Sequence, residues 1–326
     1  MKRLMSGYKY LLFALFSFSF IFNCGISSDD GRLKIAGIVF QEDQFFRMIE
    51  LGMKESAEKH GVELLTGNSS NSIDREISLI DSYIAGRADA IVISPLSIKA
   101  SVTALKRASD AGIKILTYNT TVESDIPTCY IESDQFDLGA STGKAVKEYI
   151  ESNLGGRARI AMIEFISQSP EQAQQRVDGF KSVIAEMPGV EIAAEQDAWL
   201  VQQAADVVEQ LLTAYPDLNI IWAANEGGTV GAAIGVKNTG KTGQVAVFGT
   251  DMSEQLADFL LSEDNILQAV TGQKPFDIGS LAIDNAFKIL SGESVENKIS
   301  LPGILFSRDR PQEVSEYKER LKALSK

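Results

Sequence analysis

The sequence has very few of the residues that most catalytic and metal centres use. Its 326 residues include one histidine and two cysteines. No His-Cys-carboxylate cluster has the spacing of a metal site, and neither a G-x-S-x-G elbow nor a Walker loop occurs. The histidine, His60, stands near the end of a predicted helix, where a surface position is the ordinary expectation. The sequence therefore predicts a protein that is not an enzyme and needs no cofactor.

Positive charge is also scarce. Lysine and arginine number 31 against 44 aspartate and glutamate residues, and the net charge is −13. Binding to nucleic acid or to an anionic membrane surface needs basic patches, so this balance argues against both. Low-complexity tracts and short tandem repeats do not occur, and the 44% of hydrophobic residues predicts a substantial core.

A long apolar run is present only at the N-terminus. Lys2, Arg3 and Lys9 accompany the uncharged stretch LLFALFSFSFIF (11–22), which is short for a membrane span but typical of a signal peptide. The segment IFNCG then places Cys24 where bacterial lipoprotein signals carry the lipidated cysteine. A plain export signal and an uncleaved anchor are the alternatives.

Cleavage before Cys24 would make residues 1–23 a signal peptide and residues 24–32 a lipidated cysteine with a flexible tether. The loss of three basic residues leaves 28 against 44 acidic ones, a net charge of −16. The chain is then expected to be exported and lipid-anchored to a bacterial membrane, on its periplasmic or cell-surface side. The other cysteine, Cys129, would have no disulfide partner.

From Leu33 onward, apolar strands alternate with amphipathic helices. Predicted strands such as 33–40, 88–95 and 158–166 are nearly continuous apolar runs, and the helices between them carry apolar residues three and four apart. Strands of parallel sheets have this composition because helices cover both faces of the sheet. The pattern occurs twice along the chain, which predicts an α/β fold with two similar lobes.

Polar side chains recur where the predicted strands end. Ligands of open α/β sheets bind in the crevice at the carboxyl ends of the strands. A turn or a helix cap would explain any one of these residues. Their repetition, with Trp199 and Gln273 as poor turn formers, favours a shared polar cleft. The strands deliver Asp43, Ser94, Asn119, Asp134, Trp199, Asn225, Asp251 and Gln273.

Two adjacent phenylalanines follow the first predicted strand. Phe46 continues the apolar stripe of the next helix, so a core position would explain it. Phe45 lies off that stripe by about 100° of helix rotation, which favours stacking on a ligand.

The ordered motifs DQFF, ISPLS, TYN, IESD, QRVDGF, VFGTD and TGQKPFDIG resemble those of periplasmic sugar-binding proteins of the ribose-binding type. These proteins share their fold with the ligand-sensing core of LacI-family repressors. The resemblance implies two Rossmann-like lobes with parallel sheets, joined by three crossover segments. The first lobe would hold residues 33–133 and 274–301, and the second 134–273 and 302–326. A DNA-binding regulator would need a helix-turn-helix where this chain has an export signal.

The resemblance also implies which residues contact the ligand. Arg176 falls on the family's guanidinium position, although without the resemblance a solvated helix arginine would be the preferred interpretation. Asp251 could instead cap the next helix, a role that Ser253 can also take. Ribose binders usually have Asp-Arg at Asn119-Thr120, which leaves a ligand other than ribose open. The implied contacts are Asp43, Phe45, Phe46, Ser94, Asn119, Arg176, Trp199, Asn225, Asp251 and Gln273.

The implied function is that of a substrate-binding lipoprotein of an ABC transporter. It would capture a small neutral sugar between its lobes and deliver it to a membrane permease that works with an ATPase. Closure would bend the crossovers near Ser133, Gln273 and Pro302. A monomer is expected. The alternative is a sugar or autoinducer sensor that serves a chemotaxis or signalling receptor rather than uptake.

Overall fold

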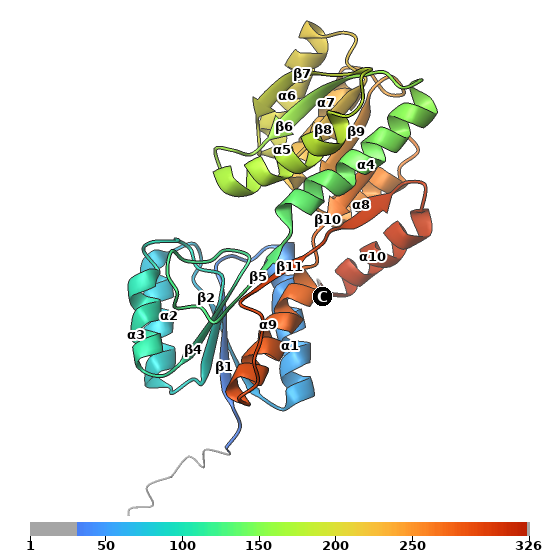
Figure 1. The fold of residues 1–326 in the computed structure, drawn as a ribbon. Coiled ribbons are helices and arrows are strands. Elements are labelled where there is room, and N and C mark those ends of the chain that lie inside the picture. The colour runs from blue at the N-terminus through green and yellow to red at the C-terminus, as the bar shows by residue number, and fades with distance from the viewer. Residues whose placement is uncertain (1–30, 325–326) are drawn as a thin grey trace, which may run out of the picture. The chain divides into compact units, whose positions relative to one another are not determined.

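A computed structural model gives the structure, and it describes residues 31–324. The predicted signal peptide and its Cys24 lie outside the described residues. The described chain contains two six-stranded sheets, both within one compact unit that begins at Leu33, and helices lie on both faces of each sheet (Figure 1). This arrangement confirms the predicted α/β fold with two lobes.

The first sheet and its helices combine segments from the two ends of the chain. They are β1 (Lys34–Val39), α1 (Gln44–His60), β2 (Glu63–Asn68), α2 (Ile73–Ala85), β3 (Ala90–Ile93), α3 (Val102–Asp110), β4 (Lys114–Tyr118), β5 (Cys129–Ser133), α9 (Pro275–Leu290) and β11 (Lys298–Leu301). The strands are all parallel, in the order β11-β5-β4-β3-β1-β2. Helices α1 and α9 lie side by side on one face, and α2 and α3 cover the other (Figure 1). Neighbouring residues of β1, such as Ile35 and Ala36, are therefore both buried, but in different cores.

The second sheet has the strand order β12-β10-β9-β8-β6-β7, and β12 pairs antiparallel with β10. Helices α4 and α5 pack together on one face, and α6, α7 and α8 lie on the other. Helix α10 contacts α8 and also α1 of the first lobe. The elements of this lobe are α4 (Gln135–Asn153), β6 (Ala158–Glu164), α5 (Pro170–Ile184), β7 (Val190–Asp197), α6 (Val201–Ala214), β8 (Ile220–Ala223), α7 (Glu226–Asn238), β9 (Ala246–Thr250), α8 (Glu254–Leu261), β10 (Leu267–Gly272), β12 (Ile304–Ser307) and α10 (Pro311–Leu324).

The chain crosses between the two sheets three times, after β5, after β10 and after β11. The hydroxyl of Ser133 in the first crossing donates to the side-chain oxygen of Gln273 in the second at 2.7 Å. The lobe boundaries drawn from the sequence, at 133/134, 273/274 and 301/302, lie within these crossings and stay a prediction.

Two glycines allow the close packing of α4 against α5. A Cβ added at Gly139 would lie 1.9 Å from the carbonyl oxygen of Arg176, and one added at Gly179 would lie 2.0 Å from that of Phe136. Any side chain at either position would therefore push the helices apart. This contact fixes the backbone of Arg176, whose side chain points toward the site described below.

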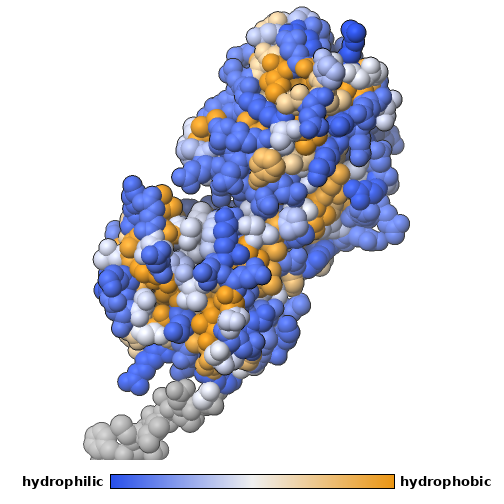
Figure 2. Space-filling view, viewed as in Figure 1, coloured by the Kyte–Doolittle hydropathy of each residue, from blue (hydrophilic) through white to orange (hydrophobic). Residues whose placement is uncertain are grey.

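The surface agrees with the acidic composition. On the face drawn in Figure 2, hydrophilic residues cover most of the protein, and apolar residues form separate patches among them. None of the helices in the described part of the chain is long and apolar enough to cross a membrane.

Candidate functional site: a cleft between the two lobes

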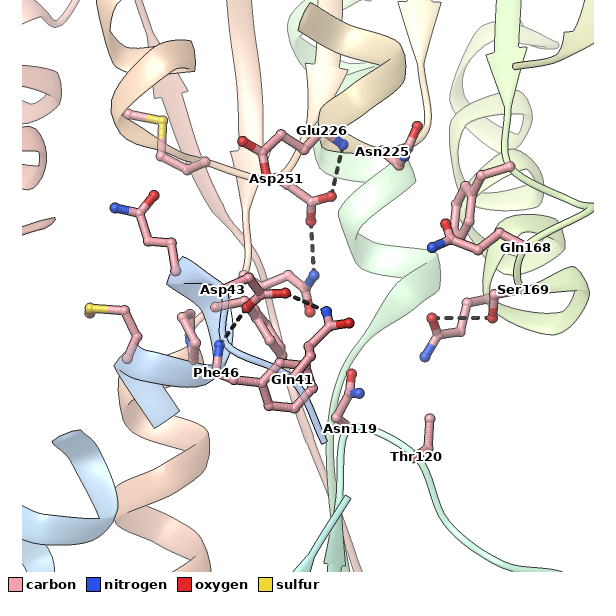
Figure 3. Close-up of a pocket in the computed structure, with 18 of the residues that line it drawn as sticks. Gln41, Asp43, Phe46, Asn119, Thr120, Gln168, Ser169, Asn225, Glu226 and Asp251 are labelled. Atoms are coloured by element: carbon pink, nitrogen blue, oxygen red, sulfur yellow. Dashed lines mark hydrogen bonds between the residues drawn. The ribbon is translucent and has the colours of Figure 1, made fainter. Parts of the chain in front are cut away.

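A cavity of about 410 Å³ lies between the carboxyl ends of the strands of both sheets (Figure 3). Its volume is in the usual range of small-molecule sites, and its walls come from both lobes. Eight of the ten residues predicted from the sequence line it: Asp43, Phe45, Phe46, Asn119, Arg176, Asn225, Asp251 and Gln273.

Asp251 follows β9 and is held in an unusual backbone conformation with φ +73°. One carboxylate oxygen accepts from the Gln273 side chain at 2.8 Å, and the other accepts from the Glu226 backbone N–H at 3.0 Å (Figure 3). Ser253, and not Asp251, caps α8. Because backbone strain of this kind persists where the surroundings enforce it, and often at binding sites, the carboxylate is positioned for a role other than helix capping.

Arg176 projects from α5 and is only 4% exposed, so it is not a solvated helix arginine. Its Nε donates to Gln135 at 2.8 Å, and its Nη1 donates to the carbonyl of Ala224 at 2.7 Å and lies 3.4 Å from Asp251. The guanidinium also stacks over the Phe165 ring at 5.0 Å. No group among the described residues accepts from Nη2, which leaves its two N–H donors for a ligand.

The first lobe supplies part of the aromatic wall. Phe46 is 3% exposed and packs in the core at 4.5 Å from the Phe40 ring, as its position on the helical stripe predicted. Phe45 is half-buried, meets Phe46 edge-on at 5.3 Å and lines the cavity. Asp43 caps α1 by accepting from the Phe46 N–H at 2.9 Å. Asn119 enters the cavity from the end of β4 with φ +60°.

Ser94 and Trp199 do not line this cavity. Ser94 is fully buried, and its hydroxyl binds the side chains of Asn119 at 3.3 Å and Thr120 at 3.1 Å. Trp199 follows β7, the edge strand of its sheet, and its ring packs against the core under α5. Its carbonyl accepts from the Asn225 side chain at 3.1 Å. Both residues therefore support residues of the cavity from behind.

Several residues of the cavity were missed in the sequence. Phe165 belongs to the apolar run of the predicted strand 158–166, which does not mark it as a cavity residue, and Glu226 is the first helical residue after Asn225. The loss of water around Glu226 raises its pKa. A hydrogen bond from Ser253 lowers this pKa, and the charges of Asp251 and Asp43 raise it. The other missed residues include Gln41, Gln168, Ser169, Gln172, Met252, Tyr317 and Leu321.

Comparison with known proteins identifies the family. Residues 38–294 match the periplasmic binding protein domain. The chain belongs to this periplasmic binding protein family. It is 28% identical over 275 residues to the ABC transporter periplasmic-binding protein YphF of Escherichia coli, covering 82% of this chain and 83% of that protein. It is 26% identical over 260 residues to the ribose import binding protein RbsB of Bacillus subtilis, covering 79% of this chain and 81% of that protein.

A solved structure of the family shows the same fold. It is a periplasmic solute-binding protein of an ABC transporter from Actinobacillus succinogenes with bound D-allose, with a TM-score of 0.76 and 25% identity over 86% of this chain and all of that one. These matches confirm the predicted resemblance to type I sugar-binding proteins. The relatives are binding proteins and not enzymes, which confirms the predicted lack of a catalytic role. Membership of a periplasmic family also means that the chain is exported.

Proposed function

We propose that this periplasmic binding protein is the substrate-binding lipoprotein of an ABC transporter, which captures a monosaccharide-sized ligand in the cleft and delivers it to a permease. The observation that carries the proposal is Asp251. Its strained backbone directs a carboxylate into the cavity, beside the buried Arg176 and the crossover residue Gln273. The relatives support it, because they include a ribose import binding protein and a periplasmic-binding protein of an ABC transporter.

The chemistry of the cleft suits a polyhydroxylated ring. Asp251 can accept hydroxyl protons, and the Nη2 of Arg176 can donate to ring or hydroxyl oxygens. Phe45 offers an apolar face for the C–H side of the ring. A ligand held by both lobes favours closure at the three crossings, and the closed form presents a surface that a permease can distinguish from the unliganded one.

Lipid anchoring through Cys24 is part of the proposal. Mass spectrometry of the mature N-terminus should find a diacylated cysteine, and the Cys24→Ser variant should be released from membranes in soluble form. Recovery of wild-type protein with an unmodified Cys24 in the soluble fraction would refute the anchor without affecting the binding role.

The binding role is tested by thermal shift with a panel of pentoses, hexoses, cyclitols and amino sugars. A ligand present at about 100 times its Kd adds about 2.7 kcal/mol to the free energy of unfolding, which raises Tm by several degrees. Asp251→Asn should abolish most of this shift, because asparagine tolerates the positive φ but carries no charge. The control is Asp178→Asn, an exposed position on α5. Retention of the full shift in Asp251→Asn would contradict the proposal.

A further inference from the structure

The cavity contains more negative than positive charge. Asp43, Glu226 and Asp251 line it, and Arg176 is the one cationic residue of its described lining. Arg176 lies 3.4 Å from Asp251, so this pair is close to neutral. Asp43 and Glu226 remain without a lysine or arginine in the cavity to balance them.

The two unbalanced carboxylates come from opposite lobes. Asp43 follows β1 in the first lobe, and Glu226 begins α7 in the second (Figure 3). Glu226 is exposed to the open cleft, but the surrounding protein removes enough of its water to raise its pKa, and the charges of Asp251 and Asp43 add to this effect. Asp43 and Glu226 line the same cavity, so their like charges repel each other across the cleft. Closure around a ligand would bring these groups nearer and remove more of their water, which is unfavourable unless a cation joins them.

Local structure does not require either charge. Asp43 caps α1, but the neutral hydroxyls of Ser72 and Ser253 make the same kind of cap at α2 and α8. The carboxylate of Glu226 receives a hydrogen bond from Ser253, and only its backbone N–H is used by Asp251. The other oxygen of Asp43 accepts from the Gln41 side chain, which is uncharged, so neither carboxylate is balanced by a cation and both charges are available to a ligand.

From this geometry we infer that the ligand carries a protonated amino group, as an amino sugar or an amino polyol does, and that Asp43 and Glu226 bind this group from the two lobes. The inference rests on the proposed function and deepens it, since it names the ligand class. It replaces the neutral sugar expected from the sequence. Asp251, Arg176 and Phe45 keep their roles toward the hydroxyls and the ring, while the ammonium group supplies the positive charge that the cavity lacks.

The test is isothermal titration with ligands that differ at one substituent, which is either a charged amine or an uncharged group. D-glucosamine, D-galactosamine and D-mannosamine are compared with glucose, galactose and mannose and with their N-acetyl forms, which keep the nitrogen but not its charge. D-glucamine and D-glucitol form a fourth pair, with the amine at another carbon. At least one amine should bind about tenfold or more tightly than its uncharged counterparts, as expected for a charge-assisted contact.

The variants Glu226→Gln and Asp43→Asn should each reduce this preference, and asparagine still caps α1. Asp74→Asn, which removes an exposed acid from the first turn of α2, is the matched control and should keep the preference. Uncharged sugars that bind as tightly as the amines, or a preference unchanged in both variants, would overturn the inference and leave the proposed function standing. If no sugar, polyol or amine bound, the proposed function would fail together with the inference.

Discussion

Glu164, at the end of β6, is a buried carboxyl group with few favourable contacts. It is 6% exposed, and its Oε1 has no hydrogen-bond partner among the described residues. Glu195 and Asp197 of the neighbouring strand β7 lie beside it, and Lys181 of α5 is paired with Glu195 at 2.6 Å. Lys181 is therefore paired with Glu195 and not with Glu164. We expect Glu164→Gln to stabilise the protein at neutral and alkaline pH.

The size of the effect follows from the pKa. Burial, and then the hydrogen bond and charge of Glu195, raise the pKa of Glu164 from 4.5 to about 7, which corresponds to about 3 kcal/mol. The hydrogen bond from Lys181, and then that from Glu164, lowers the pKa of Glu195. Since the Glu164–Glu195 contact thus affects both pKa values, only part of this energy belongs to the Glu164 charge, and about 2 kcal/mol is expected. Because the pKa is higher in the folded state, the stability that protonated Glu164 contributes is complete below pH 4.5 and is lost as the pH rises through 7.

Urea unfolding at pH 4.5 and pH 8 measures this difference. The free energy of unfolding of Glu164→Gln should exceed that of the wild type by about 2 kcal/mol at pH 8 and by little at pH 4.5. Glu151→Gln, at an exposed position of α4, should show no such dependence. A variant that is less stable than the wild type at pH 8, or a gain that is equal at the two pH values, would refute the reasoning.

Three further predictions concern packing and burial. Gly179→Ala should lower the free energy of unfolding by about 2–3 kcal/mol, because its Cβ would meet the Phe136 carbonyl at 2.0 Å. The control Gly86→Ala, whose Cβ would lie 3.3 Å from its nearest atom, should change this free energy little. Equal urea midpoints for the two variants would count against the packing argument. Thr142→Val should cost about 2 kcal/mol, because it removes the buried 2.7 Å hydrogen bond to Thr271, whereas exposed Thr213→Val should be nearly neutral. Burial, with the charge of Glu296, raises the pKa of Cys129 to about 11, so in a Cys24→Ser variant Ellman's reagent should react only after unfolding; fast reaction of the native protein would contradict this burial.

The sequence was most informative at the ends of strands. In a parallel sheet all carboxyl ends point to one edge, so a residue that directly follows a strand is placed by the strand itself. This rule located Asn119, Asn225, Asp251 and Gln273 in the cavity. Both phenylalanines line the cavity, and helical periodicity identified Phe46 as the one that also packs in the core, whereas Phe45 is half-buried. As direct contacts of a ligand, all of these residues stay predictions.

The rest of the site depends on information that local pattern does not hold. Trp199 also follows a strand, but β7 is at the edge of its sheet, and the order of strands is set by tertiary packing. Phe165 belongs to a continuous apolar run, in which a wall of the cavity cannot be told from a core residue. Tyr317 and Leu321 reach the cavity from α10, whose position is fixed by contacts with α8 and α1.

The most direct measurement is a crystal structure of the protein with the tightest ligand from the titrations. We expect density for one sugar-sized molecule whose ring lies on Phe45 and whose polar groups are within hydrogen-bond distance of Asp251 and Arg176. Density for that ligand elsewhere, such as in the groove between α1 and β2 beside Leu51 and Leu64, with the cleft left empty, would contradict it.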